Sequence, residues 1–174
     1  MNFDNDSNQF NSINIKITGI QYLIDTIILS EEFINFNTSD KNKIYTKIDK
    51  MFKLTKKDNY EIVYIILLFK EILELKKNRV GLVKYFLNNR LTSDNFIDNI
   101  IIILSIVFLV EGKYFDDFGM INSDYISLLD QMDYKISLHQ LNNMERKLLI
   151  LIDYKISLNY LDNFMILSDF LITQ

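Results

Sequence analysis

Residues 93–117 read SDNFIDNIIIILSIVFLVEGKYFDD and contain the longest apolar run of the chain, from Ile100 to Val110. Ser105 interrupts this run, which is also shorter than the roughly 20 residues that a membrane-spanning helix needs. The polar residues before it offer an N-cap and an early acidic residue. We therefore expect a long helix over 93–116 that is buried in a protein core, and no membrane partner.

A second apolar segment, YEIVYIILLFKEILEL, occupies residues 60–75 and is followed by Lys76 and Lys77. Lysine suits the C-terminus of a helix because the last carbonyl groups carry partial negative charge. A helix that is apolar on most sides is typical of a protein interior. The segment therefore predicts a second central helix, whereas residues 78–91 are compatible with either a short helix or a structured loop.

Towards the N-terminus, apolar residues recur at helical spacing over 38–54 and over about 17–35. Thr38, Ser39 and Asp40 each offer an N-cap for the first of these two helices. We expect the helix over 17–35 to pack on the main body of the protein.

Towards the C-terminus, Asn122 can cap a short helix over 123–132. Ser137 and Gln140 have the spacing of a capping box, which predicts a further helix to about residue 154. A last helix is expected over about 159–171. Because the 174 residues include no proline and only four glycines, few residues interrupt helices, and the predicted fold class is all-α.

The composition excludes several kinds of site. The chain has no cysteine and one histidine, His139, so thiolate nucleophiles, Cys-ligated metals and two-histidine metal sites are ruled out within one chain. We found no glycine-rich phosphate-binding loop. We expect no catalytic residues, no cofactor and no metal, and we interpret His139 as a surface residue at a helix start.

Charge is distributed unevenly along the chain. Residues 41–90 carry thirteen Lys or Arg against five acids, and residues 91–174 carry five against twelve. The interpretation we favour is a solvated basic surface whose lysines are spread around a helix, with a docking patch for an acidic partner as the alternative. The lysines concerned are Lys41, Lys43, Lys47, Lys50, Lys53, Lys56 and Lys57.

Several short motifs lie at the ends of the expected helices. The cap segment LTSDNF includes Asn95, and the long helix ends in Lys-aromatic-x-Asp-Asp. Downstream are N-x-x-Y, L-N-x-x-E and the segment LLILIDYKISL at 148–158. The residues that carry these motifs are Asn95, Lys113, Tyr114, Asp116, Asp117, Asn122, Tyr125, Leu141, Asn142 and Glu145.

In this order, the motifs resemble a single cyclin box, in particular that of the short Pho80-like or P/U-type cyclins. The resemblance covers residues 39–158 and is stronger in the second half. It implies a cyclin-like five-helix bundle with an additional N-terminal helix and a C-terminal helix. The corresponding divisions are an N-terminal extension over 1–37, the cyclin box over 38–158 and a C-terminal helix over 159–174.

The resemblance also implies a function. Cyclins are not enzymes: they bind and activate a cyclin-dependent protein kinase by docking on its regulatory helix, which implies a heterodimer in the cytoplasm and/or nucleus. In the family, a lysine and a glutamate at the positions of Lys113 and Glu145 grip the backbone of that helix. Neighbouring contact positions are Tyr114, Leu149, Tyr154 and Ile156. The alternative is that Lys113 and Glu145 form an internal salt bridge and that the apolar residues belong to the core.

The first half of the chain departs from the family pattern. Lys47 stands where the first box helix usually carries arginine, and Ile97 and Asp98 stand where the family has His-Arg.

Asp116 and Asp117 also suggest a Mg²⁺ pair, although an end-of-helix role requires no metal. Other functions compatible with the sequence are a non-kinase interaction scaffold with a divergent cyclin-like fold and a nucleic-acid-binding domain, against which the pI of about 5.0 argues.

Overall fold

A computed structural model describes residues 16–27, 36–76, 79–87, 93–115, 120–154 and Met165. These residues form helices and no strand, which confirms the all-α prediction for them. After an N-terminal helix over residues 16–27, the chain forms α2 (Thr38–Thr55), α3 (Asn59–Leu75), α4 (Arg79–Leu87), α5 (Ser93–Phe115), α6 (Asn122–Gln131) and α7 (Leu138–Leu151).

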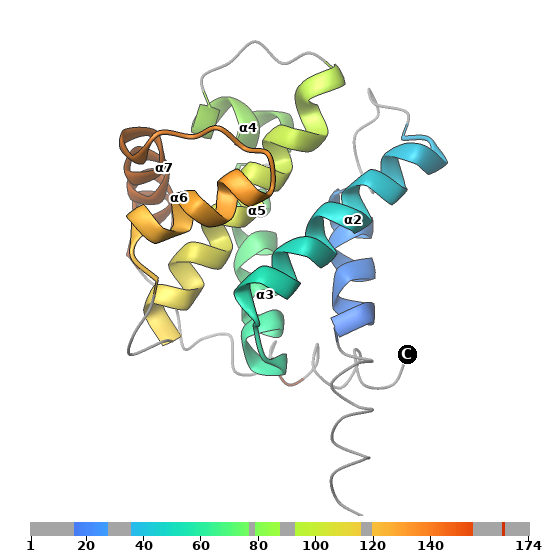
Figure 1. The fold of residues 1–174 in the computed structure, drawn as a ribbon, viewed down its shortest axis with the longest axis horizontal. Coiled ribbons are helices and arrows are strands. Elements are labelled where there is room, and N and C mark those ends of the chain that lie inside the picture. Colours follow the sequence, from blue (N-terminus) through green and yellow to red (C-terminus); the bar gives the residue numbers. More distant parts are fainter. Residues whose placement is uncertain are drawn as a thin grey trace, which may run out of the picture.

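Helix α5 is the centre of the fold, as its apolar sequence predicted. It contacts α2, α3, α4 and α7, and it passes between them in Figure 1. Every residue from Ile103 to Gly112 is buried, so the helix is covered on all sides. An edge-to-face contact between the rings of Phe52 and Phe108, with centroids 4.9 Å apart, joins α2 to α5.

Helix α3 is also central, and the N-terminal helix 16–27 packs closely against it. Nine residues of α3 are buried, which confirms that it is a central helix. A Cβ atom added to Gly19 would lie 2.9 Å from Ile62 Cγ2, so this glycine allows helix 16–27 to approach α3 closely. The helix expected over 17–35 is present in its described part, and residues 28–35 lie outside the described residues.

Capping boxes define the starts of α2, α3 and α7. The Asp58 and Ser137 side chains accept the N3 backbone N–H of α3 and α7, and the Ser137–Gln140 box confirms the prediction from sequence. For α2 the prediction was wrong: the N-cap is Asn37, not a residue of 38–40, and Asp40 is the N3 partner of its box.

The ambiguous segment 78–91 contains a helix, α4, and the C-terminal helix expected over 159–171 lies outside the described residues. Several helix ends turn through left-handed backbone without glycine. Among the described residues, those other than glycine with positive φ are Lys56, Asp133, Asp153 and Tyr154.

Candidate partner-docking site

Helices α5, α6 and α7 converge on the carboxylate of Glu145. Lys113 Nζ lies 2.6 Å from Glu145 Oε1, and Asn122 Nδ2 donates to Glu145 Oε2 at 2.6 Å. The same Asn122 amide donates to Asn142 Oδ1 at 2.6 Å. Three consecutive helices are therefore joined by one acidic side chain.

The core sets the rotation of α7 that brings Glu145 to this position. Leu141, Met144 and Leu148 are buried on the inner face of the helix. Glu145 follows Leu141 by four residues, so it lies beside the core face, where it meets α5 and α6. Lys113 lies in the last turn of α5, where a cation is favoured by the helix dipole.

Exposed apolar side chains adjoin this polar cluster. Tyr114 is 52% exposed and Ile121 is 60% exposed, and they are the sequence neighbours of Lys113 and Asn122. Phe115 and Met120 are also exposed, so four of the twelve large hydrophobic residues that are exposed in the described part of the chain flank the α5–α6 junction. An apolar surface of this kind, next to charged groups, is typical of a protein interface.

The end of α7 contributes further contact positions. Leu149 is partly buried and packs against the core, one turn after Glu145. Tyr154 is 65% exposed, and its backbone N–H donates to the carbonyl of Leu149 at 2.8 Å in the turn that ends the helix. Tyr114 and Tyr154 are thus not core residues. Lys113 and Glu145, however, do pair with each other, as the alternative interpretation expected.

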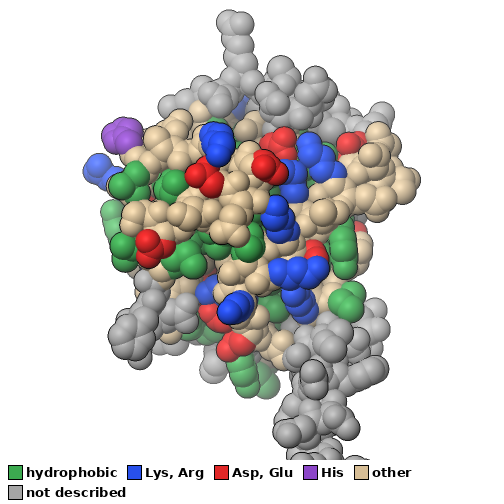
Figure 2. All heavy atoms as spheres, in the orientation of Figure 1, with side chains coloured by type: hydrophobic (Ala, Val, Ile, Leu, Met, Phe, Trp, Pro, Cys, Tyr) green, Lys and Arg blue, Asp and Glu red, His purple; other side chains and the backbone are tan. Residues whose placement is uncertain are grey.

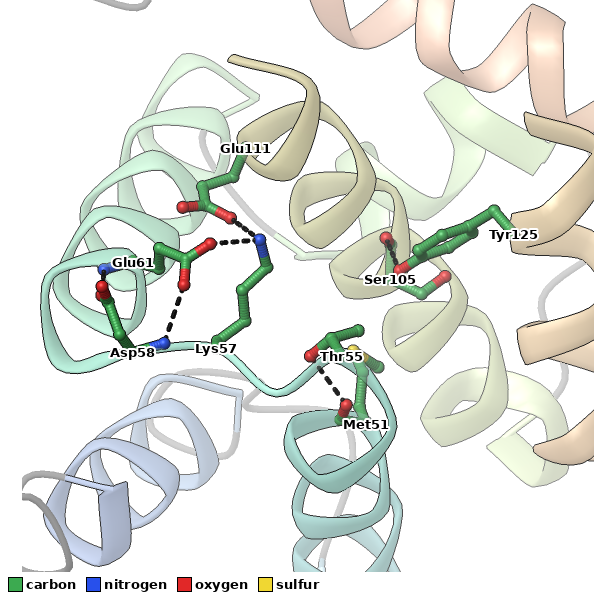
Figure 3. A network of polar contacts seen from close by, with 8 residues as sticks. All are labelled: Met51, Thr55, Lys57, Asp58, Glu61, Ser105, Glu111 and Tyr125. Atoms are coloured by element: carbon green, nitrogen blue, oxygen red, sulfur yellow. Dashed lines mark hydrogen bonds and ion pairs between the residues drawn. The ribbon is translucent and has the colours of Figure 1, made fainter. Parts of the chain in front are cut away.

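Tyr125 supports this region from inside. Its hydroxyl donates to the backbone carbonyl of Ser105 at 2.6 Å and links α6 to the middle of α5 (Figure 3). The side chain is fully enclosed, and burial, together with the nearby charge of Glu111, raises the pKa of Tyr125. It therefore remains a neutral hydrogen-bond donor.

A buried ion cluster holds the end of α5 from the opposite side. Lys57 Nζ lies 2.5 Å from Glu61 Oε1 and 2.8 Å from Glu111 Oε2 (Figure 3). Burial by itself would lower the pKa of Lys57, but its hydrogen bonds and the charges of Glu111 and Glu61 outweigh burial and raise the pKa. The sequence suggested that Lys57 belongs to a solvated basic surface. That interpretation was wrong for Lys57, because its side chain is buried in this cluster.

A different ion pair joins α2 to α5. Lys47 Nζ lies 3.3 Å from Asp98 Oδ1, and its ammonium lies 4.4 Å from the centroid of the Tyr134 ring. Lys47 and Asp98 are two of the positions at which the sequence departs from the cyclin pattern. They are brought together here as an acid–base pair between α2 and α5.

Comparison with known proteins gives no relative for this chain. No protein-family model matches it, and no match was found among curated proteins or solved structures.

None of the helices in the described ranges combines the length and apolar character required to cross a bilayer. In the same ranges, no three His, Asp or Glu side chains gather as they would around a metal ion.

The structure thus assembles part of the predicted site. It brings together Lys113, Asn122, Asn142 and Glu145, with Leu141 buried beneath them. One predicted role was wrong: Asn122 does not cap α6, because Ile121 is the N-cap residue and the Asn122 side chain reaches α7 instead. The remaining predicted positions, Asp116, Asp117, Ile156 and the side chain of Asn95, lie outside what the structure describes.

Sequence reasoning missed the Lys57–Glu61–Glu111 cluster. The available signal was Glu111 itself, an acid directly after an apolar run in the most buried helix. Buried carboxylates are almost always paired, so its position called for a cationic partner. The identity of that partner depends on the turn between α2 and α3, which periodicity does not specify.

Proposed function

We propose that this chain is a cyclin-type regulatory subunit that binds a cyclin-dependent protein kinase and activates it by docking on its regulatory helix. The observation that supports this most is the convergence of Lys113 and Glu145 from α5 and α7, beside exposed aromatic residues. The motifs around them resemble those that serve docking in cyclins.

The chemistry of the pair suits a helix as partner. A lysine ammonium has three N–H donors, and the internal contact to Glu145 occupies one of them. Lys113 can therefore donate to backbone carbonyls of a docked helix, while Glu145 accepts from N–H groups. Asn122 holds the carboxylate in place, which reduces the entropy that docking would otherwise cost.

The apolar residues supply contact area. Tyr114 and Tyr154 are large, exposed and limited to few rotamers, properties typical of interface anchors. A kinase helix held in this way completes the Lys–Glu ion pair that positions ATP phosphates, so docking alone changes activity. The chain itself performs no chemistry in this scheme.

The test separates docking from an internal salt bridge. Lys113→Glu and Glu145→Lys each break the internal pair, and the double variant with both changes restores it with reversed polarity. We expect the double variant to have a higher Tm than either single variant, although below the wild type because it loses the Asn122 bond and places an acid at the end of α5. It should bind cyclin-dependent kinases at least tenfold more weakly in a co-elution or titration experiment. Lys135→Glu is the matched control, because its side chain is 82% exposed and its ion pair is with Asp130, not with Lys113 or Glu145.

If the double variant binds and activates the kinase like the wild type, the docking assignment is wrong and the pair is structural. Affinity purification that recovers a partner lost on charge reversal, but no kinase, would support the alternative function of a non-kinase interaction scaffold.

A further inference from the structure

A groove with a basic floor runs along α2, on a different part of the surface from Glu145. Its floor is a stripe of residues spaced three or four apart, so that they share one face of the helix. We call it the lysine groove, and its floor comprises Ser39, Asn42, Lys43, Thr46, Lys47 and Lys50. Met132 and Asp133, which follow α6, form the opposite wall, and the cavity volume is ≈ 460 Å³. Figure 2 shows lysine side chains gathered over α2.

The sequence interpretation that these lysines are spread around the helix was therefore wrong for three of them. Lys43, Lys47 and Lys50 lie on the same face because they are four and three residues apart. Lys53 pairs with Asp49, and Lys57 is buried in the ion cluster described above.

Positive charge in the lysine groove is only partly neutralised. Lys43 and Lys47 share a single carboxylate, that of Asp98, at 3.4 and 3.3 Å. Lys50 Nζ donates to the backbone carbonyl of Gln131, which carries no net charge. Asp133 is the other acid at the groove, so three ammonium groups face two carboxylates. The groove thus attracts anions although the chain as a whole has a net charge of −4.

The shape of the groove selects the kind of anion. The floor from Ser39 to Lys50 spans eleven helical rises, which is about 16 Å and matches roughly five residues of extended peptide. Hydroxyl and amide groups of Ser39, Asn42 and Thr46 alternate with the lysines. The uncharged groups can bond a peptide backbone, while the ammonium groups bond its carboxylates.

We infer that the lysine groove binds a short acidic peptide segment of a partner protein. A nucleic acid fits less well because no aromatic ring of the groove is open for a base to stack on: Tyr134 is only 7% exposed, and the ammonium of Lys47 covers its ring. The groove and Asn122 lie at opposite ends of α6, about 15 Å apart along the helix. An acidic peptide can therefore bind without covering Lys113 and Glu145.

The test uses the full chain and a fluorescein-labelled peptide with five consecutive glutamates flanked by glycine and serine. Fluorescence anisotropy at 50 mM salt should show saturable binding. The double variant Lys43→Gln/Lys50→Gln should weaken it at least tenfold. Lys53→Gln/Lys135→Gln removes the same charge outside the groove and should change the affinity less than twofold. Circular dichroism melts verify that both double variants are folded, and the exposed Lys50→Gln alone provides a milder variant with an intermediate loss.

Three outcomes would overturn the inference. The first is absence of saturable binding to the pentaglutamate peptide at millimolar concentration. The second is an equal loss of affinity in the groove and control variants, which would indicate attraction by general charge. The third is tighter binding of a single-stranded oligonucleotide of the same charge, which would assign the groove to nucleic acid.

Discussion

Lys57 and Glu111 form an ion pair inside the protein, with Lys57 Nζ 2.8 Å from Glu111 Oε2 and only 6% and 1% of the two side chains exposed. Glu111 precedes Lys113 by two residues on α5. The pair therefore fixes the turn between α2 and α3 against the end of the helix that carries the candidate docking lysine.

We expect Glu111→Gln to lower the free energy of unfolding by about 3 kcal/mol, because it leaves a buried ammonium with less compensating charge. Urea denaturation measures this loss. The double variant Lys57→Met/Glu111→Leu should recover part of it, since it removes the two most buried charges and leaves Glu61, which is 16% exposed and still accepts from the backbone N–H of Asp58. Equal destabilisation by the single and double changes would contradict this account.

The same cluster sets an alkaline limit on stability. The pKa of Lys57 is raised above its ordinary value of 10.5, so its contribution is fully present below that pH. The contribution is lost as the pH rises through the higher pKa of the folded state. Wild-type and Glu111→Gln proteins should therefore differ in Tm by a constant amount from pH 7 to 10, and the difference should shrink above about pH 10.5.

Tyr125→Phe removes the buried hydrogen bond to the Ser105 carbonyl. We expect a loss of about 1 kcal/mol in unfolding free energy, measured by urea denaturation. Tyr45→Phe is the control, because Tyr45 is 41% exposed and its hydroxyl can bond to water. A loss of the same size in the control would show that the buried hydrogen bond is not the cause.

Glu71 should make the protein less stable at neutral pH than at mildly acidic pH. Burial and the charge of Glu74 raise the pKa of Glu71, so its ionised form is disfavoured in the folded state. As the pH falls through this raised pKa, the carboxyl takes up a proton and the penalty disappears. Glu71→Gln should therefore raise the Tm at pH 7, by an amount that decreases towards pH 4.5, and Glu74→Gln should give a smaller gain. A gain that is independent of pH would argue against ionisation as the cause.

Lys147 holds the end of α4 from α7. Its ammonium donates to the carbonyls of Tyr85 at 2.9 Å and Phe86 at 3.2 Å. We expect Lys147→Met to accelerate hydrogen exchange of the 79–87 amides while leaving α2 unchanged, because these carbonyls end the helix. Lys135→Met, at an 82% exposed position, should leave both helices unchanged.

The helices were predictable wherever apolar spacing and capping residues agreed. Ser137 with Gln140 defined the start of α7 correctly because only one residue there has the required partner three positions on. At α2, four consecutive residues can all cap a helix, and only Asp40 bonding back to Asn37 decides between them. Local pattern alone does not make that choice.

The polar contacts were predictable only where a known motif named both partners. Lys113 and Glu145 were expected to lie together because the cyclin pattern pairs them. Lys57 with Glu111, and Lys43 and Lys47 with Asp98, are separated by about fifty residues, and nothing in periodicity relates them. Their contacts follow from how α2 packs on α5. The lysine groove likewise needs the end of α6 as its second wall.

A glycine substitution at a left-handed helix end should raise the stability of this protein. Lys56 and Tyr154 occupy left-handed backbone, which costs roughly 1–2 kcal/mol for residues other than glycine, asparagine and aspartate. Replacing the exposed Lys56 by glycine would relieve that strain without touching the core or either proposed interface. The turn after α2 is thus a place where thermal stability can be raised by one substitution that lies outside both proposed interfaces.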